Sequence, residues 1–132
     1  MNLFIRVLLV AFALSSQSFA DEKTLTAFQI KKLLSGNTAI GRWIDHDYRQ
    51  YFDKDGSTIY AQEKQRSSLG RWRVNRLTNH YESWWEQVGW GSGYSVVLKD
   101  GVYYWVSSVG SAEPHAFEVV QGSQLLFTEK KP

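Results

Sequence analysis

Short runs in which apolar and polar residues alternate, separated by turns that contain glycine, make up most of the chain. They are clearest between Tyr81 and Ser108, where runs rich in aromatic and β-branched residues are separated by Gly91-Ser92-Gly93 and Asp100-Gly101. A period of two is typical of a strand with one buried face, and glycine turns between such runs are typical of an antiparallel meander. Roughly eight or nine short strands at intervals of about 8–12 residues are predicted, which favours a small antiparallel meander barrel over an α/β fold.

The Asp100-Gly101 pair predicts the register of one hairpin. Asp-Gly favours a two-residue turn in which both central residues have positive φ. With this turn, Leu98 lies opposite Tyr103. Because side chains alternate between the two faces of a strand, one face of the hairpin is almost wholly apolar, and we expect it to point into the core. The residues on that face are Tyr94, Val96, Leu98, Tyr103 and Trp105.

A single helix is predicted ahead of the strands. Thr26 and Gln29 have the spacing of a capping box, in which each side chain bonds the backbone N–H of the other residue. Gly36 is placed to end the helix. We therefore expect an amphipathic helix from Ala27 to Ser35 whose apolar stripe packs against the sheet. The stripe consists of Ala27, Ile30, Leu33 and Leu34.

The remaining strands are predicted from the same alternation. Two of them are joined by Asp53-Lys54-Asp55-Gly56 and another two by Gln121-Gly122-Ser123, which are turn sequences typical of hairpins. The predicted strands are residues 39–44, 48–52, 57–62, 69–75, 81–90, 116–120 and 124–128.

The first residues of the chain predict export. Arg6 is the only charged side chain ahead of residue 21, and Ser18-Phe19-Ala20 places small residues at the −3 and −1 positions of a cleavage site. This is the pattern of a secretory signal peptide. The alternative is a transmembrane anchor, although the apolar run is shorter than the ~20 residues that a span needs. We expect residues 1–20 to be cleaved, residues 21–132 to form a single β-barrel domain, and the protein to be periplasmic or secreted.

Composition removes several classes of function. The chain has no cysteine, which excludes thiol catalysis, zinc–thiolate sites and iron–sulfur clusters. Its 15 basic and 13 acidic side chains are spread along the sequence, so there is no basic patch of the kind that binds nucleic acid. We predict no cofactor, no nucleic-acid partner and no stable membrane insertion once the leader is removed.

Two polar clusters invite a metal, and neither has the spacing of a ligand set. An EF-hand loop has glycine at position 6 and glutamate at position 12, whereas counting from Asp53 puts Lys64 at position 12. The cluster Asp45-His46-Asp47 could be joined by His80 and His115, but their spacings match no metal-binding motif. On a regular strand, moreover, the two aspartates of this cluster would share a face that the histidine does not. We predict a hairpin turn at the first cluster, a solvated turn at the second, and no metal site.

The tryptophans are the unusual feature of this sequence. Trp84 and Trp85 are adjacent, so on a regular strand they point to opposite faces. A face that carries carboxylates is not expected to form dry core, because a buried unpaired carboxylate is costly. Trp84 is therefore predicted on the surface or at a barrel mouth, unless the helix, a loop or a bulge covers it. The face that it shares holds Glu82, Glu86 and Trp90.

Several motifs together resemble those of small exported proteobacterial proteins of unknown function. They are Leu34–Thr38, Tyr51–Gly56, Gly70–Val74 and Trp84. Many members of that group carry a cysteine pair near the later tryptophan, which this chain lacks. The resemblance implies a lipocalin-like β-barrel and no catalytic residues.

The aromatic strand points to a non-catalytic exported binding module. Tryptophan, tyrosine and arginine dominate binding hot spots, so the strand or the barrel mouth would contact either a small apolar ligand or an envelope protein. A hollow barrel would favour the small ligand, and a filled barrel with a flat aromatic patch would favour the protein. The predicted binding residues are Glu82, Trp84, Glu86, Trp90, Tyr94 and Trp105.

The alternative function is a hydrolase that acts on a cell-envelope polymer. On one extended strand Glu82 and Glu86 would stand ~13 Å apart, beyond the ~5–9.5 Å that separates a glycosidase carboxylate pair. The motifs of serine hydrolases, phosphate loops and dinucleotide sites are missing from the sequence. We therefore predict that the protein is not an enzyme.

Overall fold

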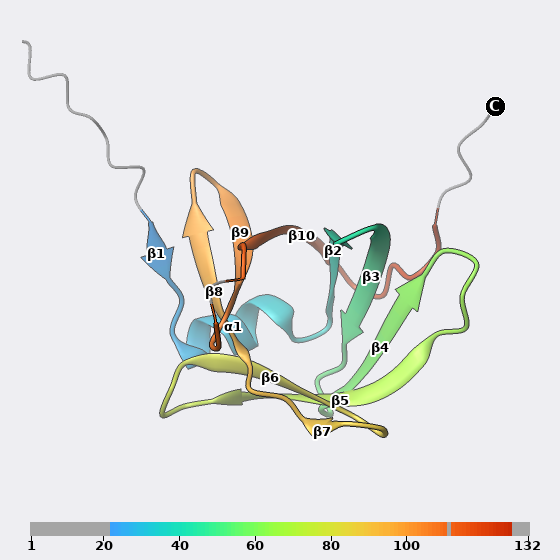
Figure 1. Ribbon diagram of the computed structural model, residues 1–132, viewed down its shortest axis with the longest axis horizontal. Coiled ribbons are helices and arrows are strands. Elements are labelled where there is room, and N and C mark those ends of the chain that lie inside the picture. The colour runs from blue at the N-terminus through green and yellow to red at the C-terminus, as the bar shows by residue number, and fades with distance from the viewer. Residues whose placement is uncertain (1–21, 111, 128–132) are drawn as a thin grey trace, which may run out of the picture.

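The computed structural model describes residues 22–110 and 112–127 of the chain. The predicted signal peptide lies outside these residues. The described part is mainly antiparallel β-structure with one short helix (Figure 1). Within it, no helix combines the length and the apolar character needed to cross a membrane.

Eight strands form a closed antiparallel barrel, as the sequence predicts. They are β2 (Asn37–Trp43), β3 (His46–Phe52), β4 (Ser57–Gln62), β5 (Ser68–Asn75), β6 (His80–Trp85), β8 (Tyr94–Lys99), β9 (Val102–Ser107) and β10 (His115–Gln121). β10 returns to pair with β2, and a single bridge between Tyr81 and Tyr94 joins β6 to β8 and closes the ring. Two short strands lie outside it: β1 (Lys23–Thr24) pairs with β8, and β7 (Gly89–Trp90) pairs with β6.

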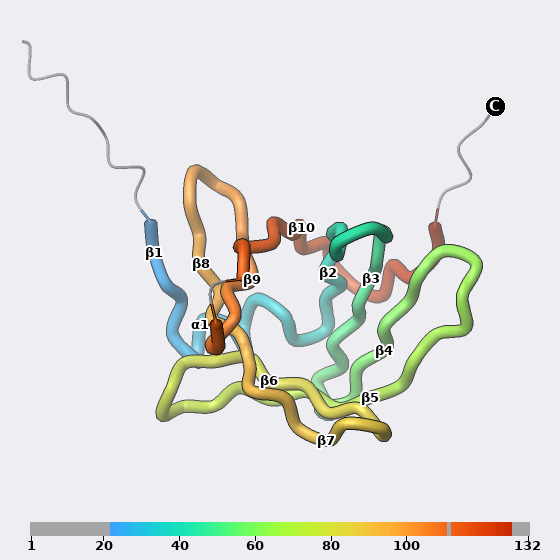
Figure 2. The backbone as a smooth tube through the Cα atoms, viewed as in Figure 1, coloured from blue at the N-terminus to red at the C-terminus, as the bar shows by residue number. Residues whose placement is uncertain are grey.

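The helix α1 (Ala27–Leu34) packs against β2, β5 and β6, and its buried side chains enter the core at one end of the barrel. Its capping box is formed, with the Gln29 N–H donating to Thr26 Oγ1 at 3.2 Å and the Thr26 N–H donating to Gln29 Oε1 at 2.9 Å. The Ala27 N–H also donates to Asn79 Oδ1 at 2.8 Å, which ties the start of the helix to the β5–β6 turn. From there α1 runs toward the start of β2 (Figure 2). It ends one residue before the predicted position, and Gly36 follows at φ 75°.

Three of the four predicted stripe residues of α1 are buried. Ile30 and Leu34 are fully buried and Ala27 nearly so, whereas Leu33 is half-buried. The helix packs against β2, β5 and β6, and its buried side chains join the core that includes Phe52. The apolar stripe therefore closes one end of the barrel.

The β8–β9 hairpin has the predicted register. Leu98 is paired with Tyr103, and Val96 with Trp105. The turn has φ 51° at Asp100 and 78° at the following glycine, as a two-residue Asp-Gly turn requires. The predicted apolar face points into the barrel, where Val96 and Trp105 are buried.

Two predicted strands are wrong in extent. β6 ends at Trp85, because a turn over residues 86–88, closed by a bond from the Val88 N–H to the Trp85 carbonyl, reverses the chain at Gly89 (φ 68°). Trp90 therefore returns on β7 and lies opposite Trp84 instead of further along the same strand.

The predicted return strand at residues 124–128 is not a strand over its described part, residues 124–127. Thr38 points outward from β2, where its hydroxyl donates to the Gly122 carbonyl at 2.6 Å and accepts the Gln124 N–H at 3.0 Å. Arg49 donates to the Gln124 carbonyl at 2.8 Å and lies over the Phe127 ring. These side chains hold the segment against the outside of β2 and β3 in place of a strand ladder.

Candidate functional site

The two ends of the barrel interior differ. At the helix end the interior is filled by fully buried side chains, among them Ile30, Phe52 and Val96. At the other end a pocket of about 470 Å³ opens between the strands. Its walls are mainly aromatic, formed by Trp43, Tyr48, Tyr60, Tyr81, Trp85, Tyr94 and Trp105.

Strand alternation brings these side chains together from distant parts of the chain. On β3, Tyr48 and Gln50 point inward, and on β6, Tyr81, Ser83 and Trp85 do so. Consecutive antiparallel strands place the end of β2, the end of β4 and the end of β6 at the same end of the barrel. The pocket therefore lies at the barrel mouth opposite α1.

Two glycines make room for two of the wall aromatics. Gly41 is paired with Tyr48, and a Cβ at position 41 would come within 2.8 Å of the tyrosine hydroxyl. A Cβ at Gly70 would clash with the Trp84 carbonyl oxygen and would come within 2.6 Å of the Trp85 ring. Each large ring packs closely against a glycine of the neighbouring strand, so the wall is lined without filling the pocket.

The floor of the pocket carries a network of buried polar groups. The Trp105 indole N–H donates to Tyr48 Oη at 2.9 Å. The side-chain amide of Gln50 donates one N–H to Tyr81 Oη at 2.9 Å and the other to Thr58 Oγ1 at 3.0 Å. Burial raises the pKa of Tyr48 to about 12 and also raises the pKa of Tyr81, so both phenols are neutral near pH 7.

Among the described residues, a single side chain that lines the pocket is charged. Glu86 stands in the turn after β6 and is exposed at the mouth. The other polar side chains are neutral, and no lysine, arginine or histidine lines the pocket within the described residues. An anionic ligand would find no opposite charge there. The neutral polar lining residues are Gln50, Ser68, Ser83 and Gln87.

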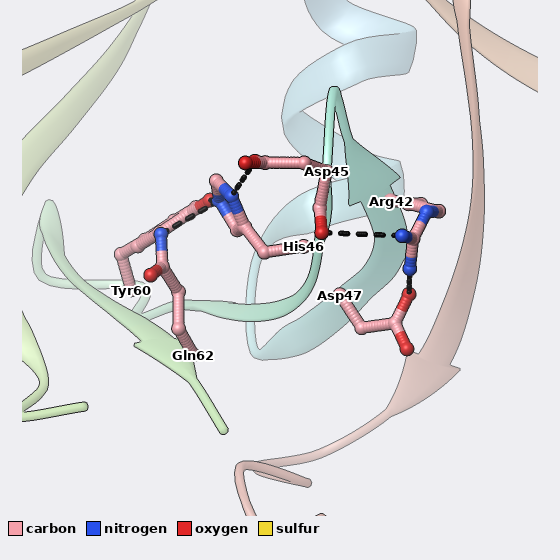
Figure 3. A network of polar contacts seen from close by, with 6 residues as sticks. All are labelled: Arg42, Asp45, His46, Asp47, Tyr60 and Gln62. Carbon is pink, nitrogen blue, oxygen red and sulfur yellow. Dashed lines mark hydrogen bonds and ion pairs between the residues drawn. The ribbon is translucent and has the colours of Figure 1, made fainter. Parts of the chain in front are cut away.

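A polar network at the rim holds Tyr60 in the pocket wall (Figure 3). Asp45 Oδ1 lies 3.0 Å from His46 Nδ1, and Tyr60 Oη lies 2.9 Å from His46 Nε2. The hydrogen bond to His46 is the main cause that lowers the pKa of Asp45. Tyr60 in turn stacks on Tyr48, with ring centroids 5.4 Å apart.

The predicted turn is formed at Asp45 of this rim cluster, but the alignment expected for its two aspartates needs correction. Asp45 lies in the β2–β3 turn and contacts His46, whereas Asp47 points away and pairs with Arg42 at 3.0 Å. The two aspartates do not share a face, because the two-residue turn interrupts the alternation of the strand. In the described residues no group of three or more histidine, cysteine, aspartate or glutamate side chains could hold a metal.

The sequence carboxylate–imidazole–hydroxyl is also that of a general-base relay. Here the His46 Nε2 that faces Tyr60 lies only 2.6 Å from Gln62 Nε2, so the tyrosine shares this nitrogen with an amide. The Asp45 side chain is 85% exposed, which leaves its hydrogen bond open to competition from water. The arrangement thus suits the positioning of Tyr60 better than its activation.

The predicted binding residues fall into two separate groups. Tyr94, Trp105 and Glu86 line the pocket. The other three, Glu82, Trp84 and Trp90, lie on the outer face of the barrel. The alignment of Glu86 with Trp84 is wrong, because the chain turns after Trp85.

Two arginines of β5 cover the outer group. Arg73 bonds Glu82 at 2.8 Å, and its guanidinium lies 3.8 Å from the centroid of Trp90. Arg71 lies 5.8 Å from the centroid of Trp84. The charges and ring faces of this group are therefore largely paired within the chain.

Sequence reasoning missed five of the wall residues, Trp43, Tyr48, Tyr60, Tyr81 and Trp85. A signal existed for Tyr81 and Trp85, because strand alternation puts them on one face together with Ser83, which also lines the pocket. Searches with the chain match no family model, no curated protein and no solved structure. The function is therefore argued from the pocket itself.

Proposed function

We propose that the protein is a non-catalytic binding protein that holds a small, uncharged, ring-containing ligand in the barrel mouth. The observation that carries this proposal is the pocket: the interior is filled at the helix end and hollow at the other. A volume of about 470 Å³ lies within the ~300–1,000 Å³ typical of small-molecule sites.

The walls indicate a flat and largely apolar ligand. Trp43 and Tyr94 meet edge to face at 5.9 Å on one side, and Tyr60 and Trp85 do so at 6.2 Å on another. Aromatic rings prefer stacked or edge-to-face neighbours, so a planar ring would gain contacts with both pairs. The lack of any lining cation in the described residues argues against an anion as the ligand.

The outer tryptophans support a protein partner less well. Trp84 is half-buried and Trp90 is 38% exposed, and an arginine already lies over each ring. A partner would have to displace these contacts before it could use the rings. Export to the periplasm or beyond, as the leader predicts, completes the proposal.

Binding of N-phenyl-1-naphthylamine, an uncharged multi-ring fluorescent probe, tests the proposal. We expect the full chain to bind the probe with a rise in probe fluorescence. Trp85→Ala should weaken binding about tenfold, through the loss of one ring contact. Ser83→Phe, which adds a ring inside the pocket, should abolish it.

Trp84→Ala is the matched control, because it removes the same type of side chain from the adjacent position of β6, where the ring lies on the outer surface of the barrel. It should leave the affinity for the probe unchanged. Equal losses in the two tryptophan variants, or no binding by the wild-type chain, would contradict a ligand site in the mouth.

A further inference from the structure

The hydrogen bonds at the floor of the pocket determine which polar atoms face a ligand. Thr58 is the starting point, since its hydroxyl donates to the Tyr51 carbonyl at 2.8 Å. Because the only hydrogen of this hydroxyl is donated to Tyr51, Thr58 Oγ1 can only accept a hydrogen bond from Gln50. The side-chain amide of Gln50 must therefore turn its NH₂ group to Thr58, 3.0 Å away.

This orientation leaves one atom of Gln50 for the pocket. Its second amide hydrogen is donated to Tyr81 Oη at 2.9 Å. The remaining polar atom is Oε1, an acceptor on a side chain that is only 7% exposed and lines the pocket. Within the described residues no hydrogen bond reaches this oxygen.

Tyr48 contributes the complementary group. An indole N–H can only donate, so Tyr48 Oη is the acceptor in its 2.9 Å bond with Trp105. The hydroxyl hydrogen of Tyr48 is then free to be donated elsewhere. Burial raises the pKa of this phenol to about 12, so the hydrogen is present at neutral pH. Tyr48 is 3% exposed and lines the pocket beside Gln50.

On neighbouring inward positions of β3 the pocket floor thus presents one unused donor and one unused acceptor, and the hydroxyl of Tyr81 on β6, which accepts from Gln50, is a second donor beside them. A buried polar group left without a partner is costly, so a wholly apolar ligand that displaced water from the floor would lose the hydrogen bonds of these groups. A ligand that supplied an acceptor and a donor of its own would replace those hydrogen bonds and avoid this cost.

We propose that the ligand of the mouth pocket is a cyclic amide or a close analogue, an uncharged ring whose edge carries a hydrogen-bond acceptor for the Tyr48 hydroxyl and an N–H donor for Gln50 Oε1. This deepens the proposed function and rests on it. The ring body lies among the wall aromatics, and the amide edge points to the floor.

Displacement of N-phenyl-1-naphthylamine by a series of two-ring compounds tests the inference. Quinolin-2(1H)-one has both the carbonyl and the N–H, N-methylquinolin-2-one has only the carbonyl, and naphthalene has neither. We expect quinolin-2(1H)-one to bind about tenfold more tightly than N-methylquinolin-2-one, and naphthalene to bind most weakly. A comparison of naphthalene with 1-methylnaphthalene measures the effect of the extra methyl group alone.

Two variants assign the contacts by changing selectivity, which a general loss of folding would not do. In Gln50→Met the preference for the N–H compound over its N-methyl analogue should vanish. In Tyr48→Phe the advantage of both carbonyl compounds over naphthalene should shrink by about tenfold. Because the wild-type ligand series is decisive by itself, the inference stays testable even if a variant does not fold.

The outcomes separate this inference from the proposed function. If the wild-type chain binds the fluorescent probe and naphthalene displaces it as well as quinolin-2(1H)-one does, the amide-edge inference is overturned and the pocket stands. If the selectivities persist unchanged in Gln50→Met and Tyr48→Phe, the contacts are assigned wrongly and the inference also fails. If the probe does not bind at all, the proposed function itself is wrong.

Discussion

The two ends of the barrel interior arise from the same alternation of side chains, but one end is filled by apolar side chains and the other is a pocket with polar groups. On β3, Phe52 is fully buried beneath the helix, whereas Gln50 and Tyr48 further along the same face border the pocket. At the helix end, aliphatic side chains of α1 fill the space between the strands. At the mouth no helix fills the interior in the described residues, and polar groups of the aromatic side chains border the pocket. The alternation of side chains along the strands therefore defines which residues face the interior, whereas the helix α1 determines which end of that interior is filled.

The largest effect should come from tryptophans that belong to the core. Trp72 is 6% exposed and donates its indole N–H to the Asp53 carbonyl at 2.8 Å, and Trp105 is 5% exposed. We expect Trp72→Ala and Trp105→Ala each to lower the free energy of unfolding by about 3–5 kcal/mol, through lost burial and the cavity left behind. Urea unfolding measures this. A loss below 1 kcal/mol for Trp72→Ala would show that the helix end is not the stable part of the molecule.

The local elements could be predicted because their signals are short in sequence. The capping box of α1 spans Thr26 to Gln29, and the β8–β9 register follows from Asp100-Gly101 alone. The same register placed Tyr94 and Trp105 on the inner face. The turn after Trp85 escaped prediction, because only Gly89 marks it and the preceding residues continue the alternation of a strand.

The rest of the site depends on contacts that are distant in sequence. Tyr48 meets Trp105 across 57 residues, and Thr38 holds Gln124 across 86. Neither contact can be inferred until the order of strands around the barrel is known. The alternation also does not say at which end α1 lies, so the position of the pocket had no signal in the sequence.

High pH should destabilise the mouth before it affects the aliphatic core. The pKa of Tyr48 is raised by burial from the usual value of about 10 to about 12, so the folded chain holds this proton more tightly than the unfolded chain. The resulting stability is fully present below pH 10 and is lost as the pH rises toward 12. For Tyr48 this loss is about 3 kcal/mol.

Urea unfolding at a series of pH values between 9 and 12 measures this effect. Tyr48→Phe should be less stable at neutral pH and should show a shallower decline above pH 10. The half-buried Tyr51 provides the comparison: desolvation, followed by Asp53, also raises its pKa, but less than that of Tyr48, so Tyr51→Phe should remove a smaller part of the alkaline decline than Tyr48→Phe does. An equally steep decline in Tyr48→Phe would assign the alkaline sensitivity elsewhere.

The packing of Trp85 over Gly70 can be tested by adding a single methyl group. A Cβ at position 70 would clash with the Trp84 carbonyl oxygen and would also come within 2.6 Å of the Trp85 ring, so Gly70→Ala should displace the neighbouring strand and the ring and cost about 1–3 kcal/mol. The near-ultraviolet circular dichroism should change with it. In the Trp85→Ala background the same substitution should cost less. Equal costs in both backgrounds would mean that the whole cost arises from the clash with the Trp84 carbonyl and none of it from the ring.

The smallest effect on stability is expected from the substitution of Trp84. Its neighbour Trp85 is the residue whose loss is expected to weaken binding. Trp84 is half-buried on the outer face, where it contacts Arg71 and lies opposite Trp90. An exposed cation–π contact contributes about 0.5–1 kcal/mol, and surface substitutions stay mostly within about 0.5 kcal/mol, so Trp84→Ala should cost less than about 1 kcal/mol. Urea unfolding of Trp84→Ala and Trp105→Ala compares the loss in free energy of unfolding on the outer face with the loss in the core. If Trp84→Ala proved as damaging as Trp105→Ala, the outer tryptophans would be structural, and the outer face would carry as much of the stability of this barrel as its interior does.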